Sequence, residues 1–214
     1  MVDYAEALKR PFSDLKKLVI YMILSIIPVI NFISVGYLLD VADNSLKKNK
    51  DLPEWDDFAR LFVEGVKLFF ITMIYSIPLI ILLVLFVVWI IGEVGTEILS
   101  YNIEQVVSTL INLGFAASIF LAAIFLIGIL ILYFQIGAVI RYVKLRKIKE
   151  AFNFREISKK VFTTTFFVPW LIGSAIVAII TGSLSLIPYF GSAIGGAIGS
   201  IFYYTVLAEA YAKA

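Results

Sequence analysis

The stretch Leu18–Leu39 most constrains the fold, because it runs for 22 residues without a charged side chain. A helix of about 20 apolar residues crosses a bilayer, so this length favours a single span. However, Pro28 and Asn31 interrupt the stretch, since proline breaks a helix and asparagine tolerates turn geometry. The chain therefore crosses a membrane once here or turns back as a hairpin, and that choice sets the direction of everything that follows.

The composition makes lipid the natural solvent of this chain. Hydrophobic residues form 61% and charged residues 16% of the 214 residues, whereas soluble proteins are roughly half apolar and a quarter charged. A chain this short cannot hide so much apolar surface from water. We therefore expect membrane lipids to be its main partner.

Several kinds of site are excluded or disfavoured by residues that the chain lacks. It has no cysteine and no histidine, which excludes disulfides, thiolate metal sites and cysteine nucleophiles and removes the commonest general base. The formal net charge of +2 is too small to indicate nucleic acid as a partner. No pattern of residues indicates a catalytic, metal or cofactor site, so we expect no enzyme activity and no cofactor.

The apolar segments and the polar connections between them predict an all-α fold. We expect one multipass membrane domain over residues 1–214, a helical bundle of five or six transmembrane or re-entrant segments with two cytoplasmic amphipathic helices. The predicted parts are a helical hairpin at 12–47, an amphipathic helix and span at 53–91, a long span at 106–143, a second amphipathic helix and span at 153–187, and a small-residue span at 191–211.

The first amphipathic helix is predicted to begin at Pro53, where a missing N–H costs least. Trp55, Phe58 and Phe62 then fall at i, i+3 and i+7, which gives the helix one aromatic face. Glu64 lies away from that face, on the side that we expect to meet water. This pattern is typical of a helix lying in the membrane interface.

The second amphipathic helix repeats this spacing with Phe154, Ile157 and Val161. Asn153 and Glu156 precede it as a pair that resembles a capping box.

A weak internal repeat relates the opening of the chain to its end. The segment Ser25–Asn31 resembles Ser185–Gly191, and a glycine follows five residues later in both, at Gly36 and Gly196. We interpret this as internal duplication. The alternative is chance recurrence of Ile-Pro in apolar sequence, as at Ile77–Pro78.

The positions of lysine and arginine predict the topology. They lie in four places only: the N-terminus through Lys17, the region Lys47–Lys67, the region Arg141–Lys160, and Lys213. The positive-inside rule places all four in the cytoplasm, which predicts a cell-membrane protein with cytoplasmic N- and C-termini.

That topology favours the hairpin over the single span, because the chain must cross an even number of times between Lys17 and Lys47. Its arms, Leu18–Ile27 and Phe32–Leu39, are only about 15 and 12 Å long as helices, shorter than the ~30 Å hydrocarbon core. The hairpin therefore extends into its polar flanks or is re-entrant. We expect two acids that follow it, Asp40 and Asp43, to pair with Lys16 or Lys17.

The last span carries the clearest packing signal. Gly191, Gly195 and Gly199 lie four residues apart, and Gly196 belongs to a second row with Ser192 and Ser200. Small residues at this spacing let helix backbones approach closely in lipid. The partner is either another helix of the same chain or a second copy, so a homo-oligomer is one possible outcome.

Two further groups of residues are candidate sites. Pro28, Asn31 and Pro188 mark helix breaks, which form solute sites in some transporters, although a tight turn at the far interface is the favoured explanation of Pro28–Asn31. The basic residues at the end of the long span are candidates for binding anionic lipid headgroups, although such residues often only set orientation. They are Arg141, Lys144, Arg146 and Lys147.

Four runs of sequence resemble a known family: Ile27–Phe32, Gly36–Leu39, Leu52–Phe58 and Gly65–Lys67. They are similar to the uncharacterised multipass membrane proteins of domain-of-unknown-function family four thousand and thirteen (DUF4013), common in archaea and also found in bacteria. The resemblance covers nearly the whole chain and implies an integral membrane protein of about this size. It implies no activity, ligand or site residue.

The sequence therefore favours a non-enzymatic membrane scaffold or accessory protein that packs against lipid or partner helices. The alternative is a small transporter or channel for an uncharged or lipidic solute, with the breaks at Pro28–Asn31 and Pro188–Gly191 along its path.

Overall fold

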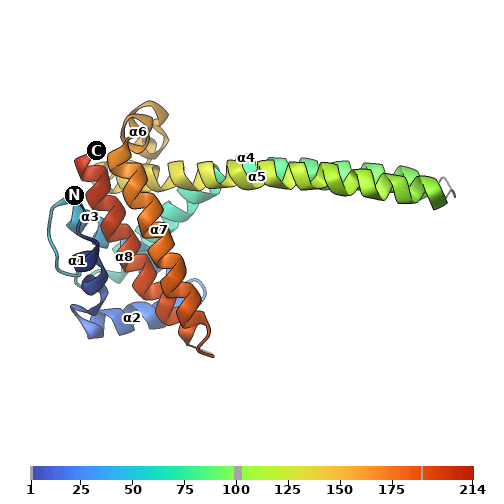
Figure 1. The fold of residues 1–214 in the computed structure, drawn as a ribbon. Coiled ribbons are helices and arrows are strands. Elements are labelled where there is room, and N and C mark those ends of the chain that lie inside the picture. The colour runs from blue at the N-terminus through green and yellow to red at the C-terminus, as the bar shows by residue number, and fades with distance from the viewer. Residues whose placement is uncertain (1, 99–102, 189) are drawn as a thin grey trace. The chain divides into compact units, whose positions relative to one another are not determined.

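The computed structural model describes residues 2–98, 103–188 and 190–214 (Figure 1). These residues form helices joined by short turns, and no strand occurs among them. In chain order the elements are α1 (Tyr4–Lys9), the 3-10 turn η1 (Arg10–Phe12), α2 (Leu15–Ile26), α3 (Asn31–Leu46), α4 (Phe58–Ile98), α5 (Ile103–Leu145), the 3-10 turn η2 (Ile148–Phe152), α6 (Phe154–Val161), α7 (Thr164–Ser185) and α8 (Gly191–Lys213).

The chain forms two compact units. Unit 1 combines the two ends of the sequence, Met1–Ile71 and Tyr133–Ala214, and unit 2 is the intervening segment Thr72–Leu132. Unit 1 holds most of the polar residues and is the part that carries the candidate site.

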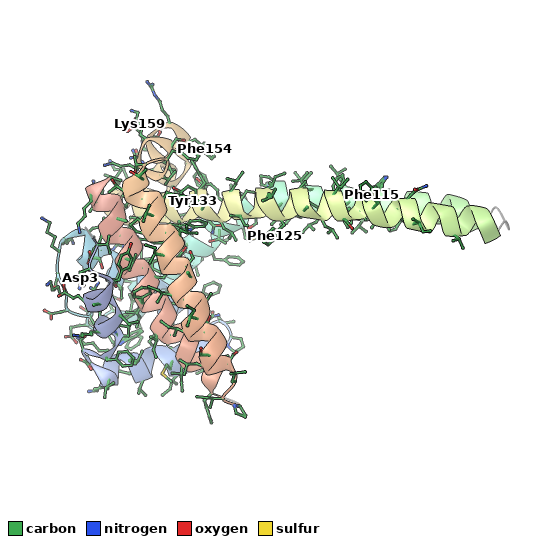
Figure 2. All side chains as sticks on the ribbon, viewed as in Figure 1. Asp3, Phe115, Phe125, Tyr133, Phe154 and Lys159 are labelled. Atoms are coloured by element: carbon green, nitrogen blue, oxygen red, sulfur yellow. The ribbon has the colours of Figure 1, made fainter. Side chains whose placement is uncertain are left out.

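Helix α8 is the centre of unit 1. It contacts α1, η1, α2, α3 and α7, and Figure 1 shows α2 running crosswise to α7 and α8. The core of this assembly joins side chains of α2, α3, the following loop and α8: Leu18, Tyr21, Tyr37, Leu38, Val41, Leu52, Ala197, Ile198 and Ile201. Within unit 1, the ring of Tyr133, a residue of α5 labelled in Figure 2, packs edge-on against Trp170 of α7, with ring centroids 4.8 Å apart.

The stretch predicted as one span or a hairpin is two separate helices, α2 and α3. Ile27 is extended, and Val29 has a φ of 70° in the left-handed region. The N–H of Ile30 donates to the Pro28 carbonyl at 2.8 Å, and the N–H of Asn31 donates to the Ile27 carbonyl at 2.9 Å. A single continuous helix over Leu18–Leu39 is therefore wrong, because this turn replaces the helical ladder.

The turn between α7 and α8 has the same pattern of hydrogen bonds. The N–H of Phe190 donates to the Pro188 carbonyl at 2.9 Å, and the N–H of Gly191 donates to the Ile187 carbonyl at 3.2 Å. These groups correspond one for one to those of the first turn in the alignment of the internal repeat. The shared hydrogen bonds support duplication of the turn itself.

The expected helix start at Pro53 is wrong, since α4 begins at Phe58. Residues 51–57 instead form an extended segment, here called the strap. The ring of Trp55 stacks on Tyr37 of α3 with centroids 3.9 Å apart, and the Tyr37 hydroxyl donates to the Pro53 carbonyl at 3.1 Å. These contacts with α3 hold the strap in an extended form and keep it out of the helix.

The other boundaries differ less from the predicted ones. The hairpin predicted at 12–47 is α2 and α3 over Leu15–Leu46, and the long span predicted at 106–143 is α5 over Ile103–Leu145. The part predicted at 153–187 is two helices, α6 and α7, and the small-residue span predicted at 191–211 is α8, which continues to Lys213.

Helices α3 and α4 cross at very close range through two glycines. A Cβ atom added to Gly36 would lie 2.7 Å from the carbonyl carbon of Leu61, and one added to Gly65 would lie 2.7 Å from the carbonyl carbon of Phe32. In each case the carbonyl oxygen would be closer still. The contact is reciprocal, because Gly36 follows Phe32 by one helical turn and Gly65 follows Leu61 by one turn. Only hydrogen fits at these two positions.

Unit 2 is an antiparallel helical hairpin made from α4 and α5. Phe86 stacks on Phe120 with centroids 5.4 Å apart, and Leu79, two turns before Phe86, lies against Gly128. Most of its described outward side chains are apolar. Figure 2 marks two of them, Phe115 and Phe125, which are 73% and 68% exposed.

Four helices among the described residues are long and apolar enough to cross a membrane: Phe58–Gly92, Ile111–Leu145, Thr164–Ser185 and Gly191–Lys213. The all-helical membrane fold class is thus confirmed. The count of five or six segments stays a prediction, because α2 and α3 have only 12 and 16 residues.

Candidate functional site

A cluster of charged side chains joins α3, α4 and the end of α5 within unit 1. It contains three acids, three bases and one tyrosine, here called the charge cluster: Asp40, Asp43, Arg60, Glu64, Lys67, Tyr142 and Arg146. Its formal charges balance.

Glu64 is the buried member of the charge cluster, with 8% of its surface exposed. It accepts hydrogen bonds from the Tyr142 hydroxyl at 2.6 Å and from Lys67 at 2.7 Å, and Arg146 lies at 3.1 Å. The expectation that Glu64 faces water is therefore wrong. A carboxylate with three donors is well compensated for its loss of hydration.

Arg146 brings the end of α5 into the charge cluster. It has a φ of 52°, which ends the helix in the left-handed region, and its guanidinium lies 3.1 Å from Asp40. Burial alone would lower the pKa of Arg146, but the hydrogen bond to Asp40 and the nearby carboxylates raise it. Arg60 makes a bidentate contact with the same carboxylate, since its two terminal nitrogens donate to the Asp40 oxygens at 3.1 and 2.7 Å.

The expected pairing of Asp40 and Asp43 with the lysines that begin α2 is wrong. Asp43 lies 3.6 Å from Arg146, while Lys17 pairs with Glu54 of the strap at 2.7 Å. The reason is the turn after α2, together with the strap, which places Glu54 beside Lys17 and leaves the acids of α3 facing α4 and α5.

Arg10 is a second buried charge, with 6% of its surface exposed. Its terminal nitrogens donate to the hydroxyls of Ser45 and Thr205 and to the carbonyls of Asn49 and Asp51, with the last three contacts at 3.1, 3.2 and 3.0 Å. The Nε atom has no partner. Burial lowers the pKa of Arg10, and the charges of nearby acids only partly oppose this. The guanidinium thus ties the N-terminal segment to α3, to the loop after it and to α8.

A cavity of about 750 Å³ lies beside Arg10. Five bases and four acids line it, together with small residues of α1 and α8: Lys9, Arg10, Lys48, Lys50 and Lys213; Asp3, Glu6, Asp51 and Glu209; Ala7 and Ala212. Two of the four acids have a basic partner, since Glu6 pairs with Lys50 and Glu209 pairs with Lys213.

A second cavity of about 550 Å³ lies between the strap and the charge cluster. Its lining is mainly acidic, with Asp51 shared between the two cavities: Asp40, Asp43, Asp51, Glu54, Asp56, Arg60 and Arg146. In the part of the chain that the structure describes, no three acids are grouped so that they could hold a metal ion.

The predicted lipid-headgroup residues divide into two kinds. Arg141 donates to Glu150 at 2.7 Å, and Arg146 belongs to the charge cluster, so both are engaged within the chain. Lys144 and Lys147 are exposed. The hydrogen bond from Arg141 lowers the pKa of Glu150.

The predicted packing glycines of α8 meet α7 of the same chain. A Cβ on Gly191 would lie 2.8 Å from the carbonyl carbon of Leu184, one on Gly195 would lie 3.0 Å from Thr181, and one on Gly199 would lie 3.2 Å from Val177. Gly196 is different, because a Cβ there would meet open space.

The predicted break residues lie in the two similar turns. Pro28 and Pro188 are exposed, and Asn31 is half-buried as the first residue of α3. The exposed neighbours are apolar, for example Val29 at 64% and Leu186 at 83%. None of these residues lines either cavity described above.

Sequence reasoning missed three buried polar residues: Arg10, Glu64 and Tyr142. One signal was available for Glu64, since it follows Arg60 by four residues and precedes Lys67 by three, which places all three on one helix face. Nothing local distinguishes Arg10 from the other bases of the N-terminus.

Comparison with known proteins identifies a family for this chain but no individual relative. No curated protein and no solved structure matches the chain. A family model, Protein of unknown function (DUF4013), matches residues 20–189. That match includes the first of the two similar turns, the glycine crossing and the charge cluster, and it ends within the second turn. It covers more than half of the chain, which therefore belongs to the DUF4013 family.

Proposed function

We propose that this protein is a non-enzymatic integral membrane protein that acts by packing apolar helix faces against lipid and partner helices. One observation carries the proposal: in the most apolar windows of α4, α5 and α7, only 11% of residues are buried inside the protein. The charge cluster, by contrast, is satisfied within the chain. The surface left for interaction is therefore mainly apolar.

We further propose that both termini lie in the cytoplasm. Asp3 and Lys213 line the same cavity, so the two ends of the chain are neighbours in space, which supports a location on the same side of the membrane. The basic residues near both ends favour the cytoplasmic side.

The outward face of α7 is the best candidate for contact with a partner helix. Ala175, Ala178 and Gly182 are exposed and lie on one side of α7 at i, i+3 and i+7. Small residues at such spacing allow a second helix to approach closely. The glycine face of α8 is a poorer candidate, because α7 already covers it.

Disulfide cross-linking in lipid tests this proposal, because the chain has no cysteine of its own. We expect Ala178→Cys to form a covalent dimer, or a cross-link to another membrane protein that is also seen by native mass spectrometry from lipid discs. Ala197→Cys is the matched control, since Ala197 is 2% exposed and faces the core. If Ala178→Cys remains a monomer and nothing co-purifies, the role in partner packing is refuted.

No observation favours transport in the same way. The turns at Pro28–Asn31 and Pro188–Gly191 line neither of the described cavities. For that reason we propose no solute path along them.

A further inference from the structure

We propose that α2, the turn at residues 27–30 and the start of α3 form a re-entrant hairpin whose tip is buried among lipid acyl chains. The hairpin enters the membrane and returns on the same side. The proposal rests on the membrane location in the proposed function, and it names lipid as the partner of this particular surface.

The first argument is length. Helix α2 has 12 residues and α3 has 16, which at 1.5 Å per residue gives about 18 and 24 Å. The last part of α3 carries Asp40 and Asp43, which belong to the charge cluster. Neither arm can cross a hydrocarbon core of ~30 Å. Neither arm is a span by itself, and Lys17 and Lys47 flank the pair as bases, so a return to the side from which the chain came fits both the lengths and the positive-inside rule.

The second argument is the surface of α2. Its outward face is a continuous apolar stripe of four residues: Leu15 at 63% exposed, Val19 at 48%, Ile23 at 55% and Ile26 at 59%. The opposite face is buried in the core of unit 1 through Leu18 and Tyr21. Helix α2 runs crosswise to α7 and α8 (Figure 1), and the stripe lies on its side away from that core. It fits acyl chains, since no charged residue occurs between Lys17 and Asp40.

The third argument is the backbone of the turn. The N–H groups of residues 30–33 all donate to carbonyls of residues 27–30, at distances from 2.8 to 3.2 Å. Pro28 has no N–H to satisfy. Non-helical backbone is tolerated at membrane depth only where its polar groups have partners. These four N–H groups meet that condition within the turn itself.

The fourth argument is the residue at the tip. Val29 has a φ of 70°, a conformation that glycine adopts freely and that a β-branched residue adopts only under strain. Its side chain is 64% exposed, so packing within the protein offsets little of that strain. Insertion into lipid gives the side chain the apolar surroundings that the protein does not provide.

The cysteine-free chain allows a direct test with single-cysteine variants in sealed vesicles. Lys16→Cys and Lys47→Cys report the sidedness of the two ends, and Val29→Cys reports the tip. Ile81→Cys, in the middle of the candidate span of α4, is the matched control for a side chain in hydrocarbon. Ile26→Cys lies in a regular helix and gives a second reading if the turn does not tolerate substitution.

We expect an impermeant maleimide to modify Lys16→Cys and Lys47→Cys from the same side. It should modify Val29→Cys and Ile26→Cys more than about tenfold more slowly from either side, as for Ile81→Cys, because the thiol lies in lipid. Spin labels at the two slow positions should collide with oxygen and not with a nickel chelate.

Two results would overturn the proposal. One is labelling of Lys16→Cys and Lys47→Cys from opposite sides, which means that the segment crosses. The other is fast modification of Val29→Cys and Ile26→Cys from the far side, which means that the tip lies in water. Either can occur while Ala178→Cys still cross-links, so this failure is distinguishable from failure of the proposed function.

Discussion

The glycine crossing between α3 and α4 gives the sharpest prediction about stability. In Gly36→Ala, the new methyl group would lie 2.7 Å from the carbonyl carbon of Leu61 and 2.9 Å from its Cα, whereas carbon atoms prefer about 3.5–4.0 Å. The obstacle is backbone, which cannot rotate away as a side chain would. The two helices must therefore separate by roughly 1 Å at the crossing.

The magnitude follows from two opposing effects. Overpacking a tight site costs about 1–3 kcal/mol, and a backbone obstacle places this site at the upper end. Replacing glycine by alanine inside a helix returns up to about 1 kcal/mol. We therefore expect Gly36→Ala to lower the free energy of unfolding by about 2 kcal/mol. Gly65→Ala should behave alike, because its new methyl group meets the backbone of Phe32 in the same way.

Unfolding in lipid discs or mild detergent, followed by steric trapping or thermal denaturation, measures this effect. Gly196→Ala is the matched control, since a Cβ there meets open space, and it should be neutral or slightly stabilising. The double variant Gly36→Ala/Gly65→Ala should cost less than the sum of the single variants, because the first substitution already separates the helices. The reasoning is refuted if Gly36→Ala is no less stable than Gly196→Ala.

Three further predictions concern other parts of unit 1. Gly191→Ala should lower the unfolding midpoint while Gly196→Ala leaves it unchanged, because only the first meets α7; equal effects would contradict the assignment of the two faces. Arg10→Lys should lower the free energy of unfolding by about 2–3 kcal/mol, because an ammonium cannot reach four acceptors; a neutral result in a denaturation series would contradict it. The Arg141 contact lowers the pKa of Glu150 from its ordinary value of 4.5, so its stabilising contribution is present above pH 4.5 and is lost as the pH falls through the lower folded pKa. The difference in midpoint between wild type and Glu150→Gln should therefore shrink on acidification, and a difference independent of pH would count against the contact.

Much of the helical framework was predictable because long apolar runs leave few alternatives. Helix α5 extends over Ile103–Leu145, close to the predicted 106–143. The start of α4 was not predictable from local pattern. Pro53 and Trp55 have good helix-start chemistry, yet their partner is Tyr37, which precedes them by more than a dozen residues. Such a contact overrides local preference only once the chain has folded.

The polar sites were less predictable than the helices. The spacing of the α8 glycines indicated close packing, but only the fold identifies α7 as the partner and separates Gly196 from the others. Glu64 was predicted to face water, because the sequence does not show that α3 and the end of α5 lie beside it. Arg10 is one base among several in the sequence, and it is distinguished only by acceptors brought from three distant segments.

The interleaving of the two ends of the chain in unit 1 has a consequence for biosynthesis. Arg10 and Thr205 are hydrogen-bonded across 195 residues of sequence, and α8 contacts all of the first three helices. During translation the amino-terminal helices therefore lack their main packing partner, α8, until that last helix has left the ribosome. A nascent chain truncated before Gly191 should expose its start to membrane proteases, so survival of the early segments depends on completion of the final one.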